Sequence, residues 1–235
     1  MTTDLEKLQR VLGIRFENSS LLEEALTHKS YADEHHIPYD NQRLELLGDA
    51  VVQIILTRYL FDRYPHLQEG DLTKIRSALA NQDSLAALAR IIQLGTYLRL
   101  GKGEIELNGQ DRDSTICDAF ESFIGALYLD RGLDAATKFL LEILERNCPD
   151  PSALLQDLNP KGALQELTQR TGAGTPSYKV VDVSGPDHNP VYSIELSIRG
   201  QSVCRASASS RKLAERAAAR KALDILRNRK SGETE

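Results

Sequence analysis

Two different periods of apolar residues divide this sequence of 235 residues. Up to about residue 145, apolar positions recur at the three- and four-residue spacing of helices, and no segment alternates cleanly in the manner of a strand. Beyond about residue 178, apolar and polar positions alternate, which is typical of strands with one buried face. The pattern predicts a mainly α N-terminal domain followed by an α+β C-terminal domain.

Local signals predict where the N-terminal helices begin and end. Ser20-Leu21-Leu22-Glu23 has the form of a capping box and predicts a helix that runs toward Thr27-His28. The further expected helices follow Asp40-Asn41, start near Asp71 with a break around Asn81, and cover about 114–130 and 133–145, with Gly132 between the last two. Gly95 and Gly101-Lys102-Gly103 are expected to lie in loops.

The C-terminal part reads as helix, three strands and helix. Asn159-Pro160 combines a cap residue with a proline at the first helical position and predicts a helix to about Thr171. The expected strands are 178–183, 190–199 and 201–207, and a basic, alanine-rich helix follows over about 210–227. The resulting order is α-β-β-β-α. We therefore predict a first domain over 1–146, a linker over 147–158, a second domain over 159–228 and a tail over 229–235.

The net charge of −5 hides an asymmetry between these two parts. Residues 159–235 carry 13 Lys/Arg and 8 Asp/Glu, a net charge of +5, whereas residues 1–158 carry 16 and 26, a net charge of −10. The basic part could hold a polyanion and the acidic part could hold cations, although ordinary solvated surfaces would give the same balance.

Four carboxylates at helical spacing form the first candidate site. Glu45 and Asp49 are four residues apart, and Asp118 and Glu121 are three apart, so that each pair lies on one face of its helix. Mg²⁺ prefers such oxygen ligands, and a cation between the helices would offset the repulsion within each pair. Two solvent-facing acidic helix faces remain the alternative.

The last helix forms the second candidate site. Ser210 is a suitable N-cap, which places Arg211 and Lys212 at the helix N-terminus, where free N–H groups and the helix dipole favour a phosphate. A solvated basic helix is the alternative. The residues expected to pack this helix on the sheet are Leu213, Ala217, Ala218, Leu223 and Leu226.

The remaining features of the sequence indicate where in the cell the protein is expected. No run of about 18 apolar residues predicts a membrane span, and the acidic start lacks the pattern of a signal peptide. Cys117, Cys148 and Cys204 are widely spaced, so we expect neither a disulfide framework nor a metal-binding pair among them. A cytoplasmic protein without membrane contact is expected.

Residues 41–51, Asn-Gln-Arg-Leu-Glu-Leu-Leu-Gly-Asp-Ala-Val, closely resemble the signature of the ribonuclease III family, N-E-R-L-E-F-L-G-D-A-V. Only Gln42 and Leu46 depart from it. The resemblance extends in family order to residues 25–31, 69–72 and 118–130. Four such blocks in order are a specific match that covers most of residues 4–145.

This resemblance implies an endoribonuclease that hydrolyses double-stranded RNA to 5′-phosphate and 3′-hydroxyl ends. It implies that Glu45, Asp49, Asp118 and Glu121 bind Mg²⁺, with Mn²⁺ as a substitute, and that Asp49 and Glu121 act in catalysis. It also implies a homodimer with one centre per subunit, and a substrate such as ribosomal precursor RNA. Glu69 would help to build the cleavage site. Since Gln42 replaces a Glu, we hypothesise that position 42 contacts RNA and not the metal.

The C-terminal part resembles a double-stranded-RNA-binding domain. The matching blocks are residues 160–166, 176–178, 185–188 and 210–218. The resemblance implies that Gln165 and Glu166 contact one minor groove, that the loop around His188 enters the next, and that Arg211 and Lys212 bind the phosphates between them. A non-catalytic dimer that binds duplex RNA is the alternative function. A third possibility, an acidic scaffold without RNA, leaves this match unexplained.

Overall fold

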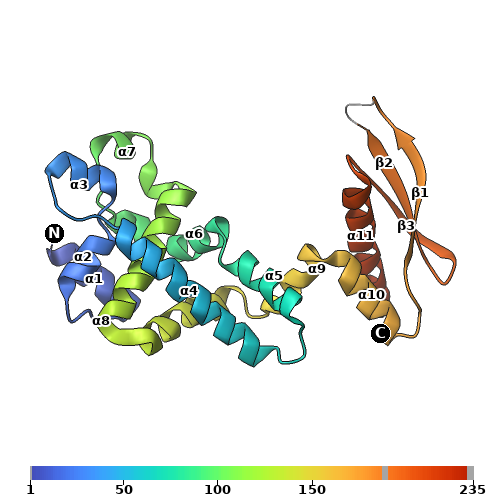
Figure 1. The fold of residues 1–235 in the computed structure, drawn as a ribbon, viewed down its shortest axis with the longest axis horizontal. Helices are drawn as coiled ribbons and strands as arrows, with labels where there is room; N and C mark the ends of the chain where they lie inside the picture. Colours follow the sequence, from blue (N-terminus) through green and yellow to red (C-terminus); the bar gives the residue numbers. More distant parts are fainter. Residues whose placement is uncertain (1, 187–189, 232–235) are drawn as a thin grey trace. The chain divides into compact units, whose positions relative to one another are not determined.

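The computed structural model describes residues 2–186 and 190–231 and divides the chain into two compact units, Met1–Pro151 and Ser152–Glu235 (Figure 1). The division falls inside residues 147–158, where the linker is expected. This range contains two short helical segments, η3 (Pro151–Ala153) and α9 (Leu154–Leu158).

The first unit is built from helices, as the spacing of its apolar residues predicts. They are α1 (Thr2–Leu12), α2 (Ser19–Ala25), α3 (Lys29–His35), α4 (Gln42–Arg63), α5 (Glu69–Leu79), α6 (Gln82–Ile91), η1 (Leu94–Tyr97), α7 (Lys102–Glu106), η2 (Gly109–Asp111) and α8 (Asp113–Asn147). Gly132 interrupts α8 with a positive φ of 80°, at the position where a break is expected. Asn41 precedes α4 and Asn81 caps α6, which also agrees with the prediction.

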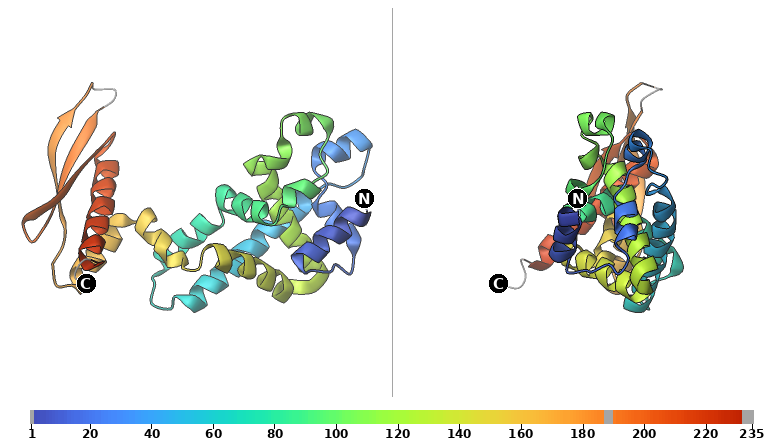
Figure 2. Two further views of the ribbon diagram at one scale, coloured as in Figure 1. Left: turned by 180° about the vertical axis from the view of Figure 1, so that it is seen from behind. Right: turned by 90° about the vertical axis from the view of Figure 1, so that its left-hand side faces the viewer.

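Helices α4 and α8 lie side by side in the centre of this unit (Figures 1 and 2). Their buried apolar residues form its core, and they include Leu44, Val51, Val52 and Ile55 of α4 and Ile116, Phe120, Phe123 and Ile124 of α8. Gly48 and Gly125 lie where the two backbones meet: a Cβ on Gly48 would lie 1.8 Å from the backbone oxygen of Glu121. This contact fixes the spacing between the two helices that carry the four carboxylates.

Three local predictions in this unit are wrong. Gly95, expected in a loop, lies in the short helix η1. Helix α2 begins one residue before Ser20, and its cap is Asn18, whose Oδ1 accepts from Ser20 N at 3.1 Å. The carboxylate of Asp130 accepts from the backbone N–H of Asn18 at 2.7 Å, a tertiary contact that local sequence does not reveal. The stretch expected as a loop at 101–103 instead opens α7, because Gly101 serves as its N-cap.

The second unit has the predicted order of elements. Helix α10 (Pro160–Arg170) precedes the strands β1 (Ser177–Ser184), β2 (Val191–Ile198) and β3 (Gln201–Ala208), and α11 (Arg211–Ser231) follows them. The sheet is antiparallel in the order β1-β2-β3, with an irregularity in the β1–β2 register between Val180 and Asp182. Asn159 caps α10 by accepting from Gly162 N, as predicted. Both helices lie on one face of the sheet (Figures 1 and 2).

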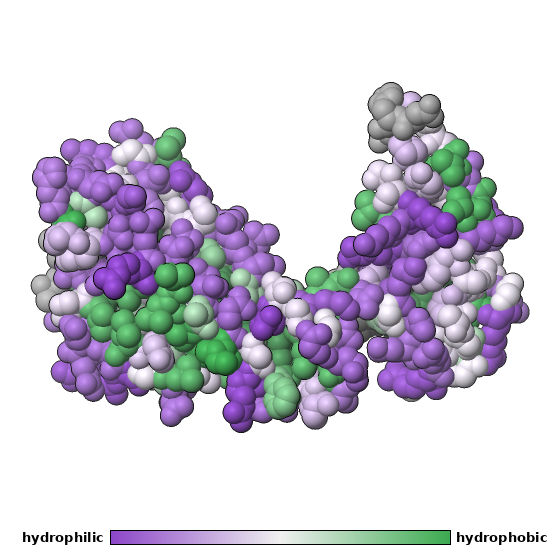
Figure 3. Space-filling model, in the orientation of Figure 1, coloured by the Kyte–Doolittle hydropathy of each residue, from purple (hydrophilic) through white to green (hydrophobic). Residues whose placement is uncertain are grey.

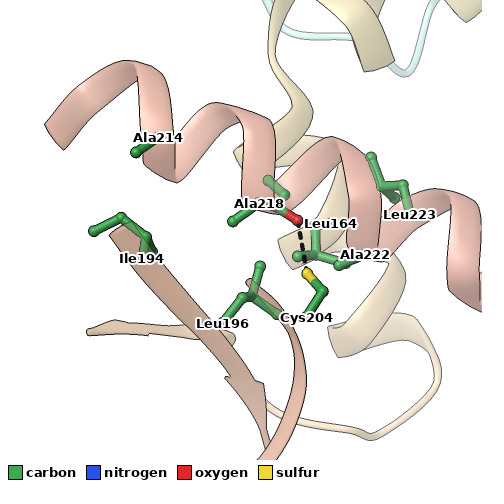
Figure 4. Packing of buried hydrophobic residues seen from close by; sticks show 9 residues of the cluster. Leu164, Ile194, Leu196, Cys204, Ala214, Ala218, Ala222 and Leu223 are labelled. Carbon is green, nitrogen blue, oxygen red and sulfur yellow. Dashed lines mark hydrogen bonds between the residues drawn. The ribbon is translucent and has the colours of Figure 1, made fainter. Parts of the chain in front are cut away.

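Small residues of α11 let this helix approach the sheet closely (Figure 4). Its buried residues are Ala214, Ala218, Ala219, Ala222 and Leu223, and they pack against Leu164 of α10 and against Ile194, Leu196 and Cys204 of the sheet. The expectation for Leu213 and Ala217 is wrong, because both are exposed. Because most buried positions of α11 are alanine, the sequence did not show which side of this helix faces the sheet.

The C-terminal helix is longer than the sequence predicted. Helix α11 continues to Ser231, so that the tail expected over 229–235 begins later, and residues 232–235 lie outside the described residues. The three cysteines are free. In the described part of the chain, no helix has the length and apolar character that a membrane crossing requires.

Candidate functional site

The four carboxylates predicted as metal ligands come from facing positions on α4 and α8. Glu45 and Asp49 lie on α4, and Asp118 and Glu121 lie on α8. Glu121 is within electrostatic range of the other three, and Glu45 is within range of Asp118. Among the described residues, no ion pair involves any of these four carboxylates.

Burial and neighbouring negative charges favour the neutral form of Glu121, Asp118 and Glu45. Burial, followed by the charges of Asp49, Asp118 and Glu45, raises the pKa of Glu121 to about 7. Burial also raises the pKa of Asp118, an effect that nearby His28 partly offsets, and burial with the charge of Asp118 raises the pKa of Glu45. A divalent cation bound among them would relieve this repulsion.

Hydrogen bonds around Asn41 hold the start of α4 against the rest of the site. Asn41 N donates to Thr27 O at 2.9 Å, and the Ser122 hydroxyl lies 3.0 Å from Asn41 O and 2.7 Å from Asp118 O. Ser122 therefore connects the segment before Glu45 to the turn of α8 that carries Asp118. The sequence did not predict this role of the Ser122 hydroxyl, because its acceptor on Asn41 is distant along the chain.

Cys117 was also missed. The cysteines were considered as metal ligands only with one another, but Cys117 lies beside two carboxylates. Its Sγ and one carboxylate oxygen each of Asp118 and Glu121 lie within 4.8 Å of one another. Burial, with the charge of Glu121 next in size, raises the pKa of the thiol to about 12. The spacing of four between Cys117 and Glu121, one helical turn, was the available signal.

The two residues predicted for cleavage-site assembly lie outside this cluster. Gln42 is exposed in the first turn of α4, and its backbone N–H donates to Asp40 Oδ1 at 3.0 Å. Glu69 is exposed at the start of α5, where its Oε1 accepts from the Thr73 hydroxyl at 2.9 Å. Both side chains are accessible to a substrate, and neither has a described hydrogen bond to the four carboxylates.

The predicted RNA-binding residues lie at the surface of the second unit. Gln165 and Glu166 are exposed on α10, and Arg211 and Lys212 are exposed in the first turn of α11. The Ser210 hydroxyl accepts from Leu213 N at 3.3 Å, which agrees with its expected role as N-cap. His188 lies outside the described residues.

A carboxylate links two cations of this surface. Glu215 accepts from Lys161 Nζ at 2.6 Å and from Arg211 Nε at 2.9 Å, so that it connects α10 and α11. Lys161 Nζ also lies 4.5 Å from the centroid of the Tyr178 ring on β1. Arg211 is therefore held by Glu215, whereas no described ion pair involves Lys212.

Comparisons with known proteins match both units. The family model described as "Ribonuclease-III-like" matches residues 18–147, and the one described as "Double-stranded RNA binding motif" matches residues 160–226. "Ribonuclease 3" of Geobacillus thermodenitrificans (strain NG80-2) is 41% identical over 224 residues, which cover 94% of this chain and 91% of that protein. "Ribonuclease 3" of Campylobacter curvus (strain 525.92) is 43% identical over 226 residues, which cover 95% of this chain and 99% of that protein.

A solved structure resembles the first unit. The nuclease domain of ribonuclease III from Campylobacter jejuni shares a TM-score of 0.59 and 38% sequence identity, over 62% of this chain and 99% of that chain. The likeness covers the part of the chain that contains α4, α8 and the four carboxylates.

Proposed function

The chain belongs to the ribonuclease III family and is an endoribonuclease of double-stranded RNA, and we propose that it cuts with Mg²⁺ held by Glu45, Asp49, Asp118 and Glu121. The observation that carries this proposal is the convergence of four carboxylates without a described ion pair, one of them with its pKa raised to about 7. Their oxygens are the ligands that Mg²⁺ prefers, and Mn²⁺ suits them as well.

The protein's own residues would position the cation and the strand to be cut. A bound divalent cation supplies Lewis-acid chemistry, which activates water and stabilises charge on the phosphate. Asp49 and Glu121 are assigned to this step because they lie on facing helices in one electrostatic cluster. The exposed side chains of Gln42 and Glu69 are assigned to contacts with the RNA strand. Products with 5′-phosphate and 3′-hydroxyl ends form part of the same proposal.

The second unit would hold the duplex by its shape. Gln165 and Glu166 are assigned to one minor groove, His188 to the next, and Arg211 and Lys212 to the phosphates between them. Structured transcripts such as ribosomal, transfer and messenger RNA precursors in the cytoplasm fit this mode, because A-form geometry is read more than sequence. The non-catalytic alternative leaves the clustering of four carboxylates without a purpose.

A homodimer is also part of the proposal. Figure 3 shows hydrophobic residues gathered on the face of the first unit where Figure 1 shows α4 and α8. The exposed large apolar residues on these two helices are Leu46, Ile54, Phe61, Leu129 and Leu133. Ile54 and Leu133 line one groove of about 680 Å³. The related nuclease domain from Campylobacter jejuni has a region involved in dimer formation.

Cleavage and binding are separable, which provides the test. We expect Asp49→Asn to lower the cleavage rate of a duplex RNA in Mg²⁺ on the order of a hundred-fold or more, as loss of a metal ligand does. Binding of the same duplex should persist because it rests on the second unit. Asp83→Asn, an exposed change on α6, is the control and should cleave normally. Normal turnover by Asp49→Asn would refute the metal assignment.

A further inference from the structure

Cys117 lies beside the four carboxylates, and the proposed cleavage chemistry assigns no role to its thiol. It directly precedes Asp118 on α8, lies one helical turn before Glu121, and is only 6% exposed. Its sulfur and the nearest carboxylate oxygens of these two residues lie within 4.8 Å of one another. The three atoms therefore lie close enough together to be candidate ligands of one cation.

The thiol has no other described partner. Cys204, the other buried cysteine, donates its S–H to Ala218 O at 3.2 Å, whereas no described hydrogen bond involves Cys117. The thiol also lies within electrostatic range of all four carboxylates, and its sulfur lies within 4.8 Å of oxygens of two of them. A buried sulfur with no described hydrogen bond thus lies beside two carboxylate oxygens, which together could supply three ligands to one cation.

A sulfur ligand changes which cation the cluster favours. Thiolates favour soft or borderline ions such as Zn²⁺, whereas Mg²⁺ takes oxygen ligands. Zn²⁺ also accepts mixed sets of thiolate and carboxylate at about 2.3 and 2.0 Å. The sulfur of Cys117 therefore adds affinity for soft or borderline ions such as Zn²⁺ and adds none for Mg²⁺.

We propose that Cys117, Asp118 and Glu121 form a binding site for a thiophilic divalent cation of the Zn²⁺ and Cd²⁺ class, and that its occupation inhibits cleavage. On binding, the cation forms bonds to Sγ and to two carboxylate oxygens, and the S–H proton passes to solvent with no change of oxidation state. The inhibition rests on the proposed function, because the site shares Asp118 and Glu121 with the Mg²⁺ centre. The binding of the cation itself does not rest on the proposed function.

Cadmium titration tests the binding without RNA or Mg²⁺. The starting protein is the full chain with Cys148→Ser, because the partly exposed Cys148 could bind Cd²⁺ alone. We expect an ultraviolet sulfur-to-cadmium charge-transfer band that saturates at one equivalent. Cys117→Ser should abolish the band, and Cys117→Ala serves if the serine variant does not fold. A band that survives both changes, or no band in the starting protein, would overturn the proposal.

The variant Glu121→Gln distinguishes a site made of sulfur and carboxylates from binding by the Cys117 sulfur alone. It should keep the band, because the sulfur remains, and should weaken Cd²⁺ affinity by roughly ten-fold or more, as for a lost ligand. Unchanged affinity would overturn the three-residue site. Circular dichroism of each variant verifies its fold.

Zinc inhibition then tests the consequence. At fixed Mg²⁺, the Zn²⁺ concentration for half-inhibition should rise about ten-fold or more in Cys117→Ser, with each protein compared with its own rate in Mg²⁺ alone. Equal sensitivity of the two proteins would refute the inhibitory role. A wild-type protein that does not cleave in Mg²⁺ would instead contradict the proposed function, and the cadmium titration would still decide the binding.

Discussion

Glu121 combines two properties at the scale of single residues: it is partly buried, and three other carboxylates lie within electrostatic range of it. Its position is secured by backbone contacts, since Gly48 and Ser122 hold the surrounding turn of α8. Burial and these neighbouring charges favour the protonated form of Glu121 in the metal-free protein. This has a measurable consequence for stability.

Folding raises the pKa of Glu121 from 4.5 to about 7. The native state thus binds more protons than the unfolded state between these values, so that its contribution to the free energy of unfolding is lost as pH rises through about 7. We expect the Tm of the metal-free protein to fall between about pH 5 and pH 8, and to fall less in Glu121→Gln. Thermal melts in a chelator measure this. Glu106→Gln, an exposed change, should melt like wild type at each pH, and equal pH dependence in Glu121→Gln would contradict the assignment.

Two helices packed through glycines provide the frame of the site at the scale of elements. Apolar spacing predicted α4 and both parts of α8, because their buried stripes are long and regular. The pairs of carboxylates followed from spacing within each helix. That α4 and α8 face each other was inferred from a cation that their carboxylates could share and from the family resemblance, since periodicity describes one helix at a time.

Features that depend on contacts distant in sequence escaped prediction. Asp130 accepts from the backbone N–H of Asn18, the cap of α2, and the Ser122 hydroxyl of α8 contacts Asn41 O before α4. The buried face of α11 was misplaced at Leu213, because alanine neither favours nor resists burial strongly enough to fix a phase. The sequence therefore predicted best the elements whose buried apolar stripe is long and regular, such as α4 and α8.

The contact between α4 and α8 leads to a prediction about Gly48. A Cβ there would lie 1.8 Å from Glu121 O, and the obstacle is backbone, so that α8 must move. We expect Gly48→Ala to lower the free energy of unfolding by about 1–3 kcal/mol, the usual cost of overpacking, and to reduce cleavage because Glu121 shifts. Urea unfolding and a cleavage assay measure the two effects. Gly70→Ala on α5, with no atom within 4 Å of the added Cβ, is the matched control; equal stability of both variants would contradict the close contact.

The N-terminus of α11 leads to a prediction about binding. Loss of phosphate contacts lowers the slope of log affinity against log salt by about one for each contact. Arg211→Ala with Lys212→Ala should therefore flatten this slope by about two and weaken all duplex sequences alike. Fluorescence anisotropy at several salt concentrations measures it. Arg205→Ala, on β3 and paired with Glu195, should leave the slope unchanged. An unaltered slope in the double variant would show that this helix end does not contact RNA.

Charge and apolar surface are distributed unequally at the scale of the whole molecule. Residues 1–158 carry a net charge of −10 and residues 159–235 one of +5, which matches a cation-binding part and a polyanion-binding part. The first unit also exposes apolar residues on α4 and α8 (Figure 3). Contiguous apolar surface of this kind marks an interface.

Leu46 on α4 tests whether this face joins two copies of the chain. Its side chain is 77% exposed, so that it adds little to the fold of one subunit, yet burial in an interface would make a charge there costly. We expect wild type to sediment as a dimer and Leu46→Glu as a monomer with unchanged circular dichroism. Leu107→Glu, at a residue 70% exposed beyond α7, repeats the same change elsewhere on the first unit and should remain dimeric. If Leu46→Glu also remains dimeric, or if wild type is a monomer at micromolar concentration, this face is not the interface. A monomeric Leu46→Glu that still binds duplex RNA would show that dimerisation and binding rest on different units of the chain.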